Sequence, residues 1–290
     1  MILKIKKILK IFITFCLASF IIHLFREAPY TRTTPHREPF PKYSAHKALV
    51  SGNHKGNTLA AIQEALESPT EGIEIDIRLS KDGVPFLYHE ETLEQDTTGQ
   101  GKPEDYTWEE LQKIAYREGS KLVRLEDVFK LVKSKKYLFL DTKTAQLCDW
   151  RFVRKLSKLI HAYQLQETVI VGSFNPIFLF WMRLATKDIL LMYDFTVNIM
   201  AMGEEIQAQF DKIPWALRQP FFQKQMRRLI RPDLLGVRWN LEEPLLKSLI
   251  DHGYPVICWT VDDIGIAHQL VELGVRGVQS NKPLVLMAAD

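Results

Sequence analysis

Apolar residues along the chain follow two alternating patterns. Short runs rich in isoleucine, valine, leucine and aromatic residues are typical of buried strands, and between them apolar residues recur as they do on one face of a helix. The predicted strands are residues 45–50, 73–79, 137–142, 168–173, 189–195, 234–239, 255–261 and 275–280, and the predicted helices are residues 58–66, 125–132, 152–163, 176–184, 243–251 and 265–273. One more strand, residues 84–88, follows a turn too short for a parallel crossover and is predicted to return antiparallel as a hairpin.

This alternation predicts an α/β fold, a (β/α)8 TIM barrel preceded by one N-terminal hydrophobic helix. Residues 90–124 are then a short insertion between the second and third barrel strands. The competing architecture is an open doubly wound sheet, which needs a glycine-rich phosphate loop after its first strand. The sequence has no such loop there. Because TIM-barrel active sites lie at the carboxyl ends of the strands, candidate residues are sought at those positions.

Polar residues of the hairpin at residues 72–89 carry the first chemical signal. Glu74 and Asp76 alternate with isoleucines and therefore point to the same side of the strand, about 7 Å apart. If the hairpin closes at Asp82 and Gly83, facing residue numbers sum to about 165, which places His89 beside Asp76. Two carboxylates this close repel each other unless a cation lies between them. The alternative is a half-exposed edge strand whose acids are solvated.

The first 27 residues form a separate segment, in which lysines precede an apolar run at residues 11–25. The run is short for a bilayer span of about 20 residues, although flanking lysines can extend it. We expect a signal anchor or signal peptide at residues 1–27, with a buried amphipathic helix as the third possibility. Residues 28–43 are predicted to be a proline-rich linker to a globular domain at residues 44–290. The protein is then predicted to be membrane-anchored and single-pass, with the globular domain on the extracytoplasmic side.

Composition narrows the range of partners. A formal net charge of +3 does not indicate nucleic-acid binding, and no nucleic-acid partner is expected. The three cysteines lie far apart and indicate neither a disulfide framework nor a cysteine metal site. Residues 213–232 interleave basic and aromatic residues, which is typical either of a segment lying on an anionic bilayer or of a barrel helix with a solvated basic face.

Several short motifs occur in an order and spacing that resemble one enzyme family. They are Asn57-Thr58-Leu59, Glu74-Ile75-Asp76, Lys81-Asp82-Gly83, His89-Glu90 and Thr97-Thr98-Gly99, followed by Asp141-Thr142-Lys143, Ser173-Phe174-Asn175, Trp259-Thr260-Val261-Asp262 and Gly274-Val275-Arg276-Gly277. From about residue 45 to residue 283 this set resembles the glycerophosphodiester phosphodiesterase family. The resemblance implies a barrel that binds a divalent metal and hydrolyses glycerophosphodiesters to glycerol 3-phosphate and an alcohol.

The resemblance also implies the roles of individual residues. The implied metal ligands are Glu74, Asp76 and Asp141; the implied catalytic residues are His46, His89 and Lys143; and the implied substrate-binding residues are Lys47 and Trp259. Carboxylate oxygens suit Mg²⁺ or Ca²⁺. A phosphodiester is anionic and its alkoxide leaves poorly, so hydrolysis needs charge neutralisation, a general base and a general acid. By resemblance, the nucleophile is the substrate's own glycerol hydroxyl, which forms a cyclic phosphate that water then opens.

Three departures from the family pattern bear on activity. The histidine motif reads His46-Lys47-Ala48 in place of His-Arg-Gly, Gly56 stands where the family has glutamate, and Asp141 replaces a ligand that is commonly glutamate. His54 is a rival for the first histidine. Asn281, which stands where the family more often has aspartate, is interpreted as a structural turn residue.

Three functional alternatives remain open at this point. Lysophospholipids could be further substrates of the tethered domain, a related phospholipase could act on phosphoinositides or sphingolipids, and a catalytically weak barrel could bind phosphorylated glycerol compounds.

Overall fold

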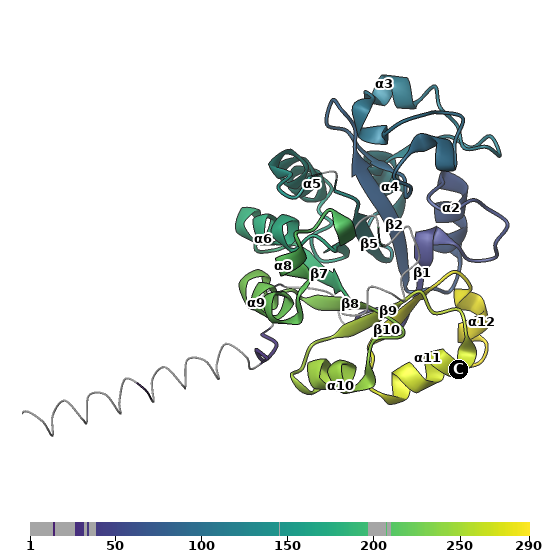
Figure 1. Cartoon of the computed structure of the whole chain (residues 1–290). Helices are drawn as coiled ribbons and strands as arrows, with labels where there is room; N and C mark the ends of the chain where they lie inside the picture. The colour runs from purple at the N-terminus through teal and green to yellow at the C-terminus, as the bar shows by residue number, and fades with distance from the viewer. Residues whose placement is uncertain are drawn as a thin grey trace, which may run out of the picture.

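Eight parallel strands form a closed barrel at the centre of the molecule (Figure 1). The computed structural model describes residues 14, 27–31, 34, 39–144, 146–196, 207 and 210–290. The barrel strands are β1 (Tyr43–Ala45), β2 (Gly72–Leu79), β5 (Tyr137–Thr142), β6 (Val169–Ser173), β7 (Leu190–Phe195), β8 (Leu234–Arg238), β9 (Val256–Trp259) and β10 (Gly277–Ser280). Each pairs in parallel with the next, and β1 pairs with both β10 and β2, which closes the barrel. The predicted TIM barrel is therefore confirmed.

Helices follow most of the strands and cover the outside of the barrel (Figure 1). They are α2 (Leu59–Glu67), α4 (Leu125–Val132), α5 (Trp150–Ala162), α6 (Pro176–Ala185), α9 (Pro220–Ile230), α10 (Glu243–Asp251), α11 (Ile264–Glu272) and α12 (Pro283–Met287), with the short α8 (Trp215–Arg218) before α9. In α5 the side chain of Asp149 accepts a hydrogen bond from the Phe152 amide and caps the first turn. Its buried residues recur at Phe152, Leu156 and Ile160, which gives one apolar face toward the strands.

Side chains that alternate between the two faces of the barrel strands form two separate apolar clusters. Leu138 and Leu140 of β5 belong to the large cluster between the strands and the helices. Tyr137 and Phe139 point the other way and join a second cluster with residues such as Met192 of β7. Since successive side chains of a strand point to opposite faces, this second cluster fills the barrel interior. Side chains at the carboxyl ends of the strands therefore rest on a packed floor.

The hairpin forms as predicted, with a register one residue away from the expected one. Strand β3 (Pro85–Leu87) pairs antiparallel with β2, and Ile77 faces Leu87. Gly83 adopts a φ of 85° in the connecting turn, a conformation that glycine tolerates readily. The insertion carries η2 (Leu93–Gln95), η3 (Pro103–Asp105), α3 (Trp108–Leu111) and β4 (Val123–Arg124) around its own small apolar cluster.

The first predicted strand is wrong in its bounds. Strand β1 ends at Ala45, and one turn of 3-10 helix, η1 (His46–Ala48), follows where residues 45–50 were expected to continue as a strand. Lys47 adopts a φ of 52° and Ala48 a φ of 59°, so the backbone turns away from the sheet immediately after the strand. As a consequence His46 lies at the barrel mouth rather than within the barrel wall.

The predicted membrane-anchored, single-pass localisation is corrected by the helices of the structure. In the part of the chain that the structure describes, no helix is long and apolar enough to cross a bilayer. The predicted N-terminal hydrophobic helix itself lies outside the described residues, apart from Thr14 and Glu27.

Residues near the predicted linker contact the barrel. The Glu27 carboxylate accepts hydrogen bonds from Arg227 of α9 at 2.9 and 2.6 Å, and the Tyr30 amide donates to the His252 carbonyl. Arg227 is buried by this contact, so this member of the basic segment at residues 213–232 belongs to the interior and not to a solvated basic face. The domain boundaries at residues 27 and 43 stay a prediction.

Candidate active site

A cavity of about 150 Å³ opens at the carboxyl ends of the barrel strands. The residues singled out from sequence, apart from Asp76, line this cavity; they are His46, Lys47, Glu74, His89, Asp141, Lys143 and Trp259. Asp76 lies just beneath, with 1% of its surface exposed. His54, the rival for the first histidine, is exposed on a loop and does not line the cavity.

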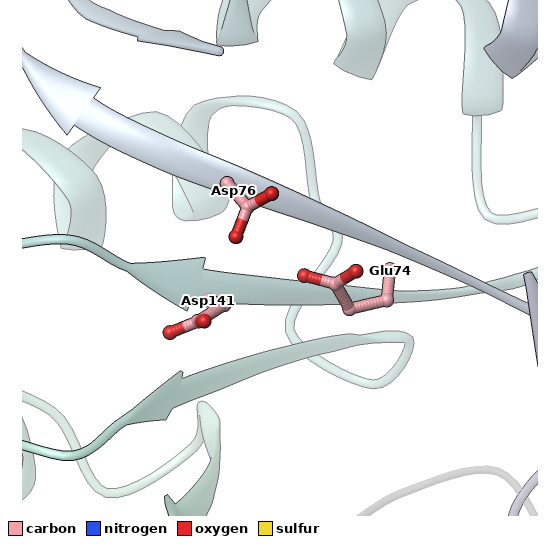
Figure 2. A group of neighbouring side chains, drawn as sticks. All are labelled: Glu74, Asp76 and Asp141. Atoms are coloured by element: carbon pink, nitrogen blue, oxygen red, sulfur yellow. The ribbon is translucent and has the colours of Figure 1, made fainter. Parts of the chain in front are cut away.

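Three carboxylates meet in this cavity. Glu74 and Asp76 come from β2, and Asp141 comes from the neighbouring β5, where it stands directly opposite Asp76 in the parallel register. Figure 2 shows their side chains pointing into one space. One oxygen atom from each residue lies within 4.8 Å of the others. This is a spacing that a single metal ion could bridge.

Lys143 compensates part of this negative charge. Its ammonium Nζ lies 3.0 Å from Asp76 Oδ1 and 2.6 Å from Asp141 Oδ2, and its side chain is 4% exposed. Burial acts to lower the pKa of Lys143, but the two carboxylates outweigh burial and raise it well above its ordinary value. Although burial opposes the change, Lys143 lowers the pKa of Asp76. Lys143 and Asp76 are therefore both charged.

Among the three carboxylates, Glu74 is the one whose negative charge is not sufficiently balanced by nearby positive charge. Burial raises the pKa of Glu74 well above its ordinary value, and the charges of Asp76 and Asp141 raise it further. Among the described residues, Asp141 Oδ1 is buried without a hydrogen-bond partner. Surplus negative charge and an unsatisfied oxygen are both relieved by a hard divalent cation, which prefers carboxylate ligands. The residues present therefore fit a divalent metal.

Backbone and amide groups orient the acids of β2. Asn57, which lies just before α2, donates from Nδ2 to Asp76 Oδ2 at 2.7 Å and accepts at Oδ1 from the Asp76 amide at 3.0 Å. The Lys47 amide donates to Glu74 Oε2 at 2.7 Å. The segment that follows β1 thus holds both carboxylates of β2 in place.

A chain of hydrogen bonds sets the orientation of His46. Asn281 Nδ2 donates to Asp262 Oδ2 at 2.8 Å, so the amide oxygen of Asn281 faces His46 Nδ1 at 2.8 Å. Because that oxygen only accepts, Nδ1 carries the proton and Nε2 presents its lone pair, 3.8 Å from Glu74 Oε2. Burial, together with the charge of Lys47, lowers the pKa of His46 to about 4. His46 is therefore neutral near pH 7.

His89 is positioned by two neighbours. Its Nδ1 lies 2.8 Å from Glu90 Oε1, a hydrogen bond that orients the ring. Arg78, which is fully buried at the end of β2, donates from Nη2 to the His89 carbonyl at 3.0 Å and from Nη1 to Glu104 at 2.6 Å. Arg78 therefore ties the His89 loop to the insertion and to the barrel strand that carries Glu74 and Asp76.

The side of the cavity opposite β2 and β5 is built differently. It is formed by Asp194 of β7, Trp259 of β9 and Gln279 of β10, all of them nearly buried. Trp259 packs edge-on against Phe174 at a centroid distance of 5.5 Å, and Phe210 packs on Phe174 in turn. This side presents an aromatic wall with one carboxyl group.

Several residues of the site were missed from sequence. Asn281 was interpreted as a turn residue, yet it hydrogen-bonds His46. Asp194 was passed over, although an acid at the end of an otherwise apolar strand pattern was an available signal. Arg78 lies close to Asp76 in the sequence, but its partner Glu104 comes from the insertion. Glu90 follows His89 directly, and its hydrogen bond to that histidine depends on the loop conformation.

A closed parallel barrel that gathers carboxylates, a lysine and two histidines at the carboxyl ends of its strands has the layout of a TIM-barrel enzyme. A model of the glycerophosphoryl diester phosphodiesterase family matches residues 46–285, and the chain belongs to this family. The predicted family is therefore confirmed.

Individual relatives agree with this assignment. The chain is similar to a glycerophosphodiester phosphodiesterase of Caldanaerobacter subterraneus subsp. tengcongensis, with 29% identity over 82% of this chain and 93% of the relative. It is also similar to human glycerophosphodiester phosphodiesterase 1, with 28% identity over 57% of this chain and 53% of that protein.

Solved structures share the fold. A phosphodiesterase of Oleispira antarctica, solved in complex with the product sn-glycerol-3-phosphate, matches with a TM-score of 0.72 and 21% identity over 86% of this chain and 96% of that chain. A glycerophosphodiester phosphodiesterase of Thermotoga maritima matches with a TM-score of 0.64 and 22% identity over 88% of this chain and the whole of that chain, 100%. At these identities the matches describe the barrel and its connectivity.

Proposed function

We propose that this chain hydrolyses glycerophosphodiesters to glycerol 3-phosphate and an alcohol at the cavity described above, with residues 44–290 as the catalytic domain. The observation that carries the proposal is the convergence of Glu74, Asp76, Asp141 and Lys143 with two histidines in one cavity of a family member. An anionic diester needs positive charge at its phosphate and proton carriers on both sides, and this arrangement supplies these groups.

Glu74, Asp76 and Asp141 are the proposed ligands of one Mg²⁺ or Ca²⁺ ion. When bound, such an ion neutralises phosphate charge and lowers the pKa of a coordinated hydroxyl. Asn57 and the Lys47 amide hold the ligands of β2 for it. Lys143 contributes a fixed positive charge beside the phosphoryl oxygens, and the Lys47 side chain lines the same cavity.

The two histidines are the proposed proton carriers. His46 presents a lone pair at Nε2, so it accepts the proton of the glycerol hydroxyl adjacent to the ester. That oxygen bonds to phosphorus and forms a cyclic phosphodiester, while the bond from phosphorus to the alcohol oxygen breaks. His89 donates a proton to the departing alcohol. Water then opens the cyclic diester, with the proton transfers reversed.

The direct test is an assay of the full chain on glycerophosphocholine with Mg²⁺, with Ca²⁺ and with a chelator. We expect release of glycerol 3-phosphate with a metal and little release with the chelator. A cyclic glycerol phosphate detected by phosphorus NMR during turnover supports the proposed nucleophile. If glycerol 3-phosphate binds in calorimetry but no metal condition gives product, the catalytically weak barrel is the better description and the hydrolase proposal fails.

A further inference from the structure

Unsatisfied polar atoms gather on one side of the cavity. Among the residues that the structure describes, Asp194 Oδ2, Trp259 Nε1 and Gln279 Nε2 are buried without hydrogen-bond partners, and all three side chains line the cavity. Burying a polar atom without a partner costs its full desolvation penalty, so native structures seldom leave several such atoms together. A ligand that supplies their partners explains why these atoms are retained.

The barrel makes room for the Asp194 carboxyl group. A side-chain Cβ at Gly236 would lie 1.8 Å from Asp194 Oδ1, and one at Gly172 would lie 2.9 Å from Asp194 Oδ2. The strands on both sides of β7 therefore lack side chains where this carboxyl group lies. Burial raises the pKa of Asp194, Asp141 raises it further, and Lys143 and the Trp259 N–H act in the opposite direction. The Trp259 N–H therefore lies near this carboxyl group. Among the described residues, however, neither Trp259 Nε1 nor Asp194 Oδ2 has a hydrogen-bond partner.

The chemistry of these three groups defines their ligand. Two N–H donors and a carboxyl acceptor match alcohol groups, because a hydroxyl both donates and accepts. A quaternary ammonium group would suit the aromatic wall and the carboxylate, but it has no acceptor for Trp259 Nε1 or Gln279 Nε2. Asp194 does not belong to the carboxylate trio that could hold a metal. The neutral part of the substrate, its glycerol, is therefore the matching occupant.

We propose that Asp194 determines specificity by accepting a hydrogen bond from the terminal hydroxyl of the glycerol moiety, while Trp259 and Gln279 donate to its oxygens. This inference rests on the proposed phosphodiesterase function and specifies its substrate class. A lysophospholipid acylated at the terminal oxygen has no hydrogen to donate there and leaves Asp194 unpaired. The cavity of about 150 Å³ is also well below the roughly 300 to 1,000 Å³ of sites for drug-sized ligands. The chain therefore selects glycerophosphodiesters with a free terminal hydroxyl and rejects such lysophospholipids.

The test compares two substrates that differ in one hydroxyl. Glycerophosphocholine and 2-hydroxypropyl phosphocholine share the phosphocholine group and the attacking hydroxyl, and only the first has the terminal hydroxyl. The wild-type chain is expected to prefer glycerophosphocholine in kcat/KM by roughly 5- to 150-fold, the effect of leaving a buried polar group without its hydrogen-bond partner. In Asp194→Ala the preference is expected to fall to within about threefold. Lysophosphatidylcholine is expected to react with the wild type at least about 100-fold more slowly than glycerophosphocholine.

A control and a second variant separate specificity from folding. Asp233→Asn changes another buried aspartate, which pairs with Arg183 outside the cavity, and is expected to lower the melting temperature without changing the substrate preference. If Asp194→Ala does not fold, Trp259→Phe serves instead, because it removes one donor to the same glycerol and is expected to reduce the preference in the same direction.

Binding of the products tests the inference without turnover. Calorimetry with glycerol 3-phosphate and with propane-1,2-diol 1-phosphate is expected to show the same wild-type preference and the same loss in Asp194→Ala. The inference is overturned if the wild type does not distinguish the two ligands, if Asp194→Ala weakens both equally, or if lysophosphatidylcholine is the better substrate. Absence of hydrolysis together with the expected binding preference contradicts the proposed hydrolase function and leaves the role of Asp194 supported.

Discussion

The two sides of the cavity differ in how their polar groups are satisfied. The charged side is defined by Glu74, Asp76, Asp141 and Lys143 on or next to β2 and β5. The buried Lys143 forms short ion pairs there with the buried Asp76 and the half-buried Asp141. The neutral side, defined by Asp194, Trp259 and Gln279 on β7, β9 and β10, holds buried polar atoms without partners among the described residues. The difference indicates two kinds of ligand group. The charged side suits a phosphate with its cation, and the neutral side suits the hydroxyls attached to that phosphate.

This difference also has an energetic consequence. Removing one member of a buried ion pair leaves an uncompensated charge and destabilises a protein strongly. Removing a buried group that has no partner costs little and can stabilise the folded state. Substitutions of the ion-paired residues on the charged side should therefore affect stability and activity together, while those on the neutral side should affect substrate recognition alone.

The largest expected effect is that of Lys143→Met. Without the ammonium, the buried Asp76 and the half-buried Asp141 have no positive charge between them, and the free energy of unfolding in a chelator should fall by about 3 to 5 kcal/mol. Denaturant unfolding measures this change, and added Mg²⁺ should restore part of it. Lys136→Met is the matched control, because Lys136 donates to backbone carbonyls away from the cavity. An equal loss in both variants would show that the charged side has no special role.

His89→Ala should lower kcat on glycerophosphocholine by at least about 100-fold, as expected for a general acid or base. The melting temperature should change little, since His89 lies at the cavity edge and the backbone contact from Arg78 remains. His54→Ala is the control: the side chain is exposed outside the cavity, and its removal should leave kcat unchanged. A large loss in His54→Ala instead would replace His46 with His54 as the first histidine.

Glu74→Gln should weaken metal activation by at least about tenfold. Substitutions of residues that only hydrogen-bond a metal ligand already lower metal affinity or activity by about that factor. Stability in a chelator should be unchanged or higher, because burial and the neighbouring carboxylates favour the neutral form of Glu74, and glutamine is neutral as well. The raised pKa of Glu74 adds a pH signature. Wild-type Glu74 has to lose a proton when metal binds, so metal affinity should rise as the pH increases through the raised pKa of Glu74, and Glu74→Gln should lose this dependence.

Isothermal titration with Mg²⁺ at several pH values measures both parts of this prediction. Glu126→Gln, which changes an acid on α4 that bonds Tyr163, is the control and should behave as the wild type. Metal affinity that is the same in Glu74→Gln and in the wild type would exclude Glu74 as a ligand.

The smallest expected effect is that of Trp259→Phe. The variant keeps an aromatic ring against Phe174 and removes only the indole N–H. The free energy of unfolding should stay the same or rise by up to about 1 kcal/mol, because a buried donor without a partner is removed. The KM for glycerophosphocholine should rise several-fold in steady-state kinetics. A destabilisation as large as that of Lys143→Met would mean that the two sides of the cavity are built alike.

Local patterns were sufficient for the barrel class and for the hairpin. The period of the apolar residues reflects strand and helix geometry, and Glu74, Asp76 and His89 could be placed together because a two-stranded hairpin is a local structure. The hairpin register was predicted from facing residue numbers that sum to about 165. The observed pairing of Ile77 with Leu87 is shifted from that register by a single residue. The end of β1 was misplaced, because the left-handed backbone at Lys47 and Ala48 is not encoded by an unusual residue type.

By itself, then, the sequence determined the barrel, its family and the acids and histidine of the β2–β3 hairpin. Only the tertiary structure decided which side chains from other strands contact the site residues. Asp141 meets Asp76 through the parallel register of β2 and β5, Asn281 reaches His46 only because β10 pairs with β1, and Asp194 has its space because glycines of β6 and β8 flank it. These contacts join strands far apart in sequence. They depend on how the barrel closes, which no local periodicity encodes.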